Sequence, residues 1–530
     1  MTKTYMNKQD TNNSNISNDN INEERENKNQ NDNIIKKIYN KLTNYINLET
    51  TQNDISDFIK SLILVIITIV PFIVIKYGQR YYVDAKKMLL YASAVIIFAA
   101  MMFSKKIKIR REIEIALVFL ATICISAVFS SFSDTAIWGS VERREGCVMF
   151  FVYIILFIAA SSFFSIGKKS INVVLGAASI MSLYTVLQMF KIDPLQKYLY
   201  GKIVTPDTSI ATIGNSNFVS TYLSIFLVIA LGLYIYKKKL IYLFYSGIIF
   251  LGFLGARTRG GWITFAFVAI VALMLVIKNK ERLKRVGIVM VTFIVLGFSL
   301  NAVTDGMIYS RAKLSNIFEK TEQSSVKEAT SEEDGKSESE LNYQNEQATQ
   351  KEQASQSDQV QLSNEENISK ADDNEKSNGS IKLLGSFSSR ANILKVTFKA
   401  FLSRPFLGEG PDTLGLRLKR DFSSEYNEHA QLYNEGIDKA HNEYLEYATS
   451  GGIFTLLSYL VLVGMILFKL FKQRKNDESI ILFLAILMYL SQAFFNISVI
   501  MVAPLFWITM GYAVKVIYDN SSSSKLDVKQ

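Results

Sequence analysis

The order of apolar and polar residues along the chain predicts a membrane protein built from helices. Apolar runs alternate with short charged clusters over most of the sequence, and each run is roughly 18–22 residues long, enough for a helix to cross the hydrocarbon core of a bilayer. Charged residues are almost absent inside these runs, because burying a charge in lipid is costly. We therefore predict an all-α polytopic membrane protein of about twelve transmembrane helices. The predicted spans are residues 58–76, 87–104, 113–132, 148–166, 171–190, 217–236, 240–256, 261–277, 286–304, 453–471, 479–497 and 500–517.

The polar stretches divide the chain into five parts. The first part is rich in Asn, Asp and Glu and too poor in apolar residues to order itself, so we expect a largely disordered tail. A long loop separates the ninth span from the tenth. The predicted parts are the tail at 1–55, nine spans within 56–304, the loop at 305–452, three spans within 453–517 and a second tail at 518–530.

The distribution of Lys and Arg predicts which way the chain faces. One set of alternate short loops carries nineteen basic residues over five loops, and the opposite set carries eleven over five. Cytoplasmic loops of membrane proteins are the richer in Lys and Arg. Both tails are therefore expected in the cytoplasm, and the loop at 305–452 is expected outside.

The long loop changes in composition along its length. Between Glu322 and Lys376 it has fifteen acidic and five basic residues, so we predict a disordered acidic insert at 321–380. Residues 385–452 regain aromatic residues, Gly–Pro turns and helical periodicity, so this part should be ordered.

The overall composition narrows the classes of partner and site. The net charge of +10 would suit nucleic acid or a membrane, but the basic residues cluster beside the spans, so no nucleic-acid partner is expected. Two cysteines and two histidines make neither a disulfide framework nor a zinc site. Cys124 and Cys147 are interpreted as small apolar core residues.

An outer loop between the seventh and eighth spans holds two arginines, Arg257 and Arg259. An ionisable residue at a membrane boundary is a functional hypothesis, although such residues also anchor helices at the lipid headgroups. The Gly260–Gly261 pair would let an anion approach backbone N–H groups at a helix start, and the fork of arginine matches phosphate. We predict an anion site here.

Another arginine, Arg390, opens the segment 391–402, which has a helical pattern. A stripe of large apolar residues predicts a helix lying on the outer surface of the membrane. The stripe consists of Leu394, Phe398, Phe401 and Leu402. Arg404-Pro405 and a glycine-rich turn should end this helix. Packing of a surface helix explains the apolar residues of this segment, but it gives little reason for the charge of Arg390.

Both histidines lie in the ordered part of the loop. His441 stands just before the tenth span, and histidine is the side chain best suited to moving protons near neutral pH. A solitary histidine is more often structural, so this role needs support. His429 lies in a polar stretch from Glu425 to Glu435 and is expected at the surface.

Taken in order, several short motifs resemble those of the O-antigen ligase/polymerase superfamily, whose members transfer bacterial lipid-linked glycans. The motifs are Trp138–Gly146, Gly214–Phe218, Arg259-Gly260-Gly261-Trp262, Arg390, Gly408–Thr413 and Asp438–Leu445. The resemblance runs from about residue 113 to 517. Three features depart from the family pattern: Arg404-Pro405 replaces a His-Pro, Arg257 adds a charge, and the acidic insert matches no known motif.

This resemblance implies a fold and a reaction. The fold would be a membrane bundle of the C-type glycosyltransferase class. The enzyme would move a glycan from a polyprenyl-diphosphate donor to a hydroxyl of a lipid, protein or glycan acceptor. It would act among the lipids at the outer face of the bacterial cytoplasmic membrane, with no metal and no cofactor.

The resemblance also implies roles for residues. His441 would be the catalytic base, while Arg259 and Arg390 would hold the diphosphate. Beyond what the resemblance implies, we expect Arg257, Arg404, Asp438, Asn442 and Glu443 to bind the diphosphate or the glycan. Asp438 or Glu443 could orient the histidine, and direct attack would invert the anomeric centre.

Two alternatives remain open. A polymerase of carrier-linked repeat units would use the same chemistry. A transporter or flippase of lipid-linked sugars would instead place its charged groups near the bilayer midplane, whereas here the predicted spans are nearly free of charge.

Overall fold

The structure is a computed structural model, and it describes residues 36–37, 52–76, 78, 80–104, 107–205, 208–312 and 375–527. Within these ranges, the side chains of residues 52, 375–387 and 522–527 are left undescribed. The predicted acidic insert lies outside the described residues except for its last part, where a helix begins at Glu375. Most of the tail predicted at 1–55 also lies outside them.

Each of the twelve predicted spans overlaps a helix, and the described residues form no strand. The all-helical fold class is thereby confirmed. The helices are α2 (Gln52–Thr68), α3 (Asp84–Met102), α4 (Arg111–Val128), α6 (Cys147–Phe163), α7 (Lys168–Met189), α9 (Ser216–Lys237), α10 (Leu240–Gly255), α11 (Arg259–Val276), α12 (Lys280–Val303), α18 (Glu443–Lys472), α19 (Asp477–Gln492) and α20 (Ala503–Asp527).

Seven of the described helices are long and apolar enough to cross a membrane. Their outer faces carry large apolar side chains that no other part of the protein covers. On α12, for example, Phe298 is 73% exposed and Val291 is 64% exposed. Contiguous apolar surface of this kind is what a lipid environment accommodates. The chain is therefore a membrane protein, and the count of twelve spans stays a prediction.

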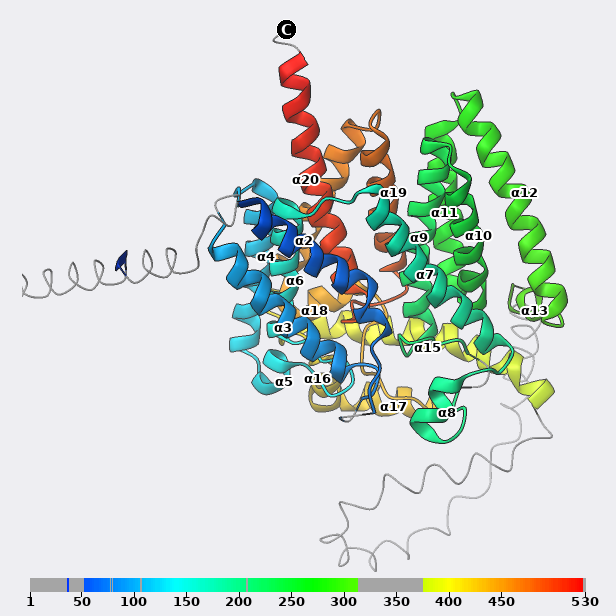
Figure 1. Ribbon diagram of the computed structural model, residues 1–530. Helices are drawn as coiled ribbons and strands as arrows, with labels where there is room; N and C mark the ends of the chain where they lie inside the picture. Colours follow the sequence, from blue (N-terminus) through cyan, green and yellow to red (C-terminus); the bar gives the residue numbers. More distant parts are fainter. Residues whose placement is uncertain are drawn as a thin grey trace, which may run out of the picture.

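The short helices gather at one end of the bundle (Figure 1). We call this end the loop end, and define it by α5 (Ser133–Trp138), α8 (Pro194–Tyr200), α13 (Met307–Ala312), α16 (Leu414–Asp421) and α17 (Ser423–Tyr433). The long helix α15 (Glu375–Ser403) runs across the bundle there, and a single 3-10 turn, η1 (Val70–Phe72), follows α2. The loop end is the end that the basic-residue pattern predicts to lie outside.

The core is formed by helix pairs that are distant in the sequence. The most extensive contacts join α6 to α20 and α4 to α18. Aromatic rings fill the space where these pairs meet, with Phe119 on α4 lying 5.6 Å from Trp507 and 5.4 Å from Tyr447 between ring centroids. These pairs place one end each of α4, α6 and α18 side by side at the loop end.

Helix α18 is broken at Gly452, where φ is 75° and ψ is −172°. A Cβ atom at this position would lie 2.1 Å from the carbonyl oxygen of Phe406, so glycine is required. The break frees backbone carbonyls of the preceding turn. Thr449 and Ser450 accept hydrogen bonds from the N–H groups of Glu409 (3.1 Å) and Gly410 (2.8 Å). The glycine-rich turn of the loop is thereby fixed to α18.

Helix α15 packs on the protein through a different face from the predicted stripe. Its buried residues include Ile393, Val396 and Ala400, which form a small core with α16 and the segment before α18. Phe398 and Leu402 of the predicted stripe are more than half exposed. The periodicity identified an apolar face but missed the narrower one that binds the protein. Contact of the uncovered stripe with the membrane surface stays a prediction.

Candidate functional site

The turn between α10 and α11 and the short helix α13 hold one another through their arginines. The Nε of Arg259 donates to the carbonyl of Arg311 (2.8 Å), and the Nε of Arg311 donates to the carbonyl of Arg257 (3.1 Å). Arg257 adopts a left-handed backbone conformation with φ of 52°, which is uncommon for a residue with a side chain. Three arginines are thus fixed at the N-terminal end of α11.

The Gly260–Gly261 pair serves helix packing as well as the turn. A Cβ atom at Gly261 would lie 2.1 Å from the Oγ of Ser220 on α9, so α11 could not approach α9 with any larger residue there. Close packing of α11 against α9 therefore explains why position 261 is a glycine, which the sequence alone did not reveal.

Arg390 lies within electrostatic range of this group. Burial lowers the pKa of Arg311, and the positive charges of Arg259, Arg257 and Arg390 lower it further. Burial also lowers the pKa of Arg390, against the opposing effect of Glu435. We call Arg257, Arg259, Arg311 and Arg390 the arginine cluster. Its four positive charges lie together in a partly buried site and repel one another. An anion bound among them would offset this repulsion.

His441 lies within electrostatic range of Arg390, one member of this cluster, and is kept neutral. Its pKa is lowered to about 4, first by burial and then by the positive charges of Lys439 and Arg390, with Asp438 acting in the opposite direction. His441 also has a left-handed backbone, with φ of 51°. A neutral imidazole is the form that accepts a proton.

The loop that carries His441 is fixed by buried ion pairs. The N–H of Ala440 donates to Glu446 Oε2 (2.8 Å), and Arg143 Nη1 donates to Glu446 Oε1 (2.7 Å). Arg143 also contacts Glu145 (3.1 Å) and Asp412 (3.4 Å), and its side chain is 9% exposed. The motif before α6, the glycine-rich turn and the His441 loop therefore meet at one arginine.

The three acidic and amide residues predicted around His441 have different roles in the structure. Asp438 is ion-paired with Lys439 (2.6 Å). Burial raises the pKa of Asp438, but Lys439, Arg143 and His441 together bring it below its usual value. Asp438 therefore remains charged beside His441, where it can orient the imidazole.

Asn442 and Glu443 stabilise the start of α18. The Oδ1 of Asn442 caps the helix by accepting from the N–H of Leu445 (2.9 Å). The carboxylate of Glu443 is buried and accepts from the hydroxyl groups of Tyr459 (3.0 Å) and Tyr489 (2.9 Å). Both oxygens of Glu443 are thus directed into the bundle, and of the two candidates for orienting His441 the structure favours Asp438.

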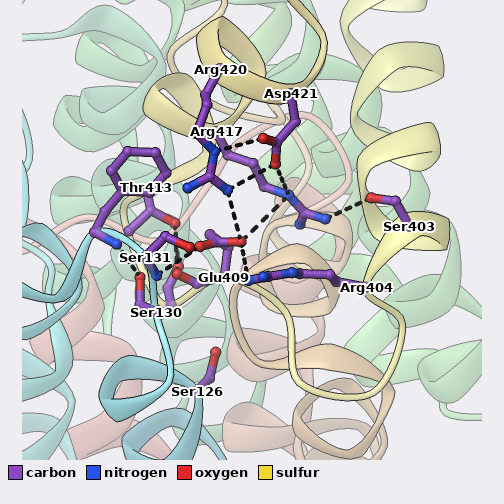
Figure 2. A network of polar contacts seen from close by, with 12 residues as sticks. Ser126, Ser130, Ser131, Ser403, Arg404, Glu409, Thr413, Arg417, Arg420 and Asp421 are labelled. Carbon is purple, nitrogen blue, oxygen red and sulfur yellow. Dashed lines mark hydrogen bonds and ion pairs between the residues drawn. The ribbon is translucent and has the colours of Figure 1, made fainter.

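Arg404 lies in a separate network centred on the buried Glu409 (Figure 2). Arg404 donates to Glu409 Oε2, and Arg417 and Arg420 approach the same oxygen at 3.9 and 3.6 Å. Glu409 Oε1 accepts from the N–H of Ser131 (2.9 Å). This network ties the turn after α15 to α16 and to the segment between α4 and α5. It does not bring Arg404 into the arginine cluster.

The prediction that His429 lies at the surface is wrong. Its side chain is fully buried on the inner face of α17, and its ring packs 4.8 Å from that of Tyr433, four residues along the helix. The polar neighbours of His429 occupy the other faces of this helix. Burial also lowers the pKa of His429.

Two site residues were missed in the sequence. Arg311 lies in a stretch with no recognised motif, and its one signal is a positive charge in a loop predicted to be outside. Arg143 lies within a family-like motif but was not singled out. Among the described residues, no group of three or more His, Cys, Asp or Glu side chains is placed to hold a metal ion.

Part of the chain is similar to a known family. A family model described as O-antigen ligase matches residues 244–460, a region that contains the arginine cluster and His441. No curated protein matches the chain. The matched region extends from α10 into α18, and it confirms the resemblance to the O-antigen ligase superfamily that the motifs predict.

Proposed function

We propose that the protein transfers a glycan from a polyprenyl-diphosphate carrier to a hydroxyl acceptor at the outer face of the cytoplasmic membrane. The family model that matches residues 244–460 supports a glycan-transferring enzyme of the ligase or polymerase type in general terms. The observation that carries the finer proposal is the position of Arg390, which influences both the arginine cluster and His441.

The arginine cluster would bind the diphosphate of the donor. Each guanidinium can bind two phosphate oxygens at once, and its charge is fixed at every physiological pH. As the bond between the anomeric carbon and the diphosphate oxygen breaks, its electron pair moves to the diphosphate. Positive groups already in place stabilise this developing charge. The arginines would thus serve the purpose for which many enzymes use a divalent cation.

His441 would activate the acceptor. Its neutral imidazole takes the proton of the acceptor hydroxyl while that oxygen forms a bond to the anomeric carbon. Asp438 stabilises the resulting imidazolium. Attack opposite the leaving diphosphate inverts the anomeric centre. The left-handed backbone of His441 is a locally strained conformation. Strained residues of this kind cluster at active sites and ligand-binding sites.

A transporter would need its charged groups where a substrate crosses the membrane. Here Arg257, Arg259 and Arg311 lie at helix ends, and His441 precedes α18. This arrangement supports chemistry at the loop end over passage through the bundle.

Transfer by the purified protein in nanodiscs tests the proposal. The donor and acceptor would both come from a strain that lacks this gene, which accumulates unused lipid-linked glycan and unmodified envelope acceptor. Arg259→Lys and Arg390→Lys should lower turnover at least about tenfold, because lysine lacks the bidentate fork. His441→Ala should abolish transfer. Arg474→Lys is the matched control, since Arg474 is exposed after α18, far along the chain from the cluster.

Two results would count against the mechanism. Full transfer by His441→Ala would remove the base from it. Loss of wild-type transfer in EDTA, with recovery on adding Mg²⁺, would show that a metal and not the arginine cluster neutralises the diphosphate.

A further inference from the structure

A cavity of about 480 Å³ opens at the loop end beside the His441 loop. Its wall is assembled from segments far apart in the sequence: the start of α3, the motif before α6, the region from α8 to α9, the His441 loop and the segment between α19 and α20. The residues that characterise it are Tyr81, Tyr200, Phe218, Asn215, Asp438 and Lys439. Its volume lies in the range typical of small-ligand sites.

Two sets of hydrogen bonds hold the wall in place. The buried Lys86 donates to the carbonyls of Tyr82 (3.0 Å) and Thr212, which joins the start of α3 to the segment before α9. The side-chain oxygen of Gln196 accepts from the N–H groups of Val204 (2.9 Å) and Thr205 (3.0 Å). The cavity is therefore formed before any ligand arrives.

The lining combines aromatic rings with charges that compensate one another. The rings of Tyr81 and Tyr200 lie 5.6 Å apart between centroids. Arg80 is paired with Glu142, and Lys439 is paired with Asp438. Apolar C–H faces of sugar rings pack on aromatic rings, while their hydroxyl groups hydrogen-bond to polar side chains. A hydroxyl-rich, uncharged sugar fits this lining better than an anion.

The wall of the cavity includes Asp438 and Lys439, which precede His441 by three and two residues. The charges that act on His441 include Arg390 from the cluster, and Lys439 and Asp438 from the wall of the cavity. No member of the arginine cluster lines the cavity within the described residues. Inverting transfer requires that the acceptor approach opposite the leaving diphosphate. A sugar in the cavity would reach His441 past Asp438 and Lys439, through a wall that contains no member of the cluster.

We infer that this cavity binds the sugar residues of the acceptor glycan, with Tyr81 and Tyr200 as the stacking platforms. This inference rests on the proposed function. It adds the chemical class of the acceptor, a neutral carbohydrate, and the residues that select it.

The test compares three tyrosines in the nanodisc assay. Tyr81→Ala and Tyr200→Ala should raise the half-saturating concentration of the envelope acceptor about five- to tenfold, the loss expected of one aromatic contact. The half-saturating concentration of the lipid-linked donor should stay within twofold of wild type. Tyr198→Ala is the matched control, because Tyr198 lies on the same helix as Tyr200 but is 66% exposed and outside the cavity. Tyr200→Phe keeps the ring and should restore acceptor binding, which separates stacking from a folding defect.

The outcomes distinguish the inference from the function on which it rests. If wild type transfers glycan and Tyr200→Ala behaves like Tyr198→Ala, the acceptor site is wrong and the enzymatic function stands. If the donor requirement rises in place of the acceptor requirement, the cavity holds the donor sugar. If wild type transfers nothing from donor to acceptor, the proposed function and the inference fall together.

Discussion

As pH falls, activity should be lost only at an acid limit well below the usual pKa of histidine. Burial and neighbouring positive charges lower the pKa of His441 from 6.5 to about 4. A general base works in its neutral form, so activity should persist as pH falls and be lost only as pH approaches 4. At pH 5.5 a histidine with a pKa of about 4 is roughly 97% neutral, whereas one with a pKa of about 6.5 is roughly 9% neutral. The two cases differ about tenfold in rate.

Substitution of the charged neighbours should move this limit in opposite directions. Lys439→Met removes a positive charge and leaves Asp438 without its partner, so the pKa of His441 should rise. Asp438→Asn removes the negative charge and should lower the pKa of His441 further. Burial is the largest cause of the shift, so Lys439→Met should recover only part of the interval between about 4 and 6.5.

The assay is the pH dependence of kcat/KM at low donor concentration, which reports the free enzyme. The acid limit of kcat should lie at a higher pH than that of kcat/KM, because bound diphosphate offsets the charge of Arg390. An acid limit of kcat/KM near 6.5 in wild type would refute the environment described for His441. So would shifts of the same sign in Lys439→Met and Asp438→Asn.

Three other predictions follow from the loop end. Arg311→Lys should lower turnover at least about tenfold at normal protein levels, because the cluster loses a bidentate fork; turnover equal to that of Arg474→Lys would remove Arg311 from the site. Arg143→Met should destabilise the fold by about 3–5 kcal/mol, because three carboxylates lose their buried counter-charge, and an unchanged melting temperature in detergent would contradict this. The Sγ atoms of Cys124 and Cys147 lie 3.2 Å apart, so diamide should join them in a disulfide. Mass spectrometry should then show a loss of about 2 Da, whereas Cys147→Ser should show none.

The amino-acid sequence determined the helices and most of their ends. The length of an apolar run and the charges at its edges are local properties, so the run from residue 217 to 236 corresponds closely to α9, Ser216–Lys237. The predicted tenth span begins at residue 453, directly after the break that the structure places at Gly452. The family motifs singled out Arg259, Arg390 and His441 as candidates, since each lies in a short contiguous stretch.

The tertiary structure decided which of these residues meet. Arg311 and Arg390 are separated by a long stretch of chain, and no periodicity records that their charges act on one another. Arg404 and Glu443 are predicted to bind substrate, and the structure pairs Arg404 with Glu409 and Glu443 with two tyrosines. His429 was expected at the surface because its sequence neighbours are polar, but it lies on the inner face of α17 and is buried there. Burial and charge pairing depend on what the rest of the chain brings to a side chain, and a local pattern carries no information on that.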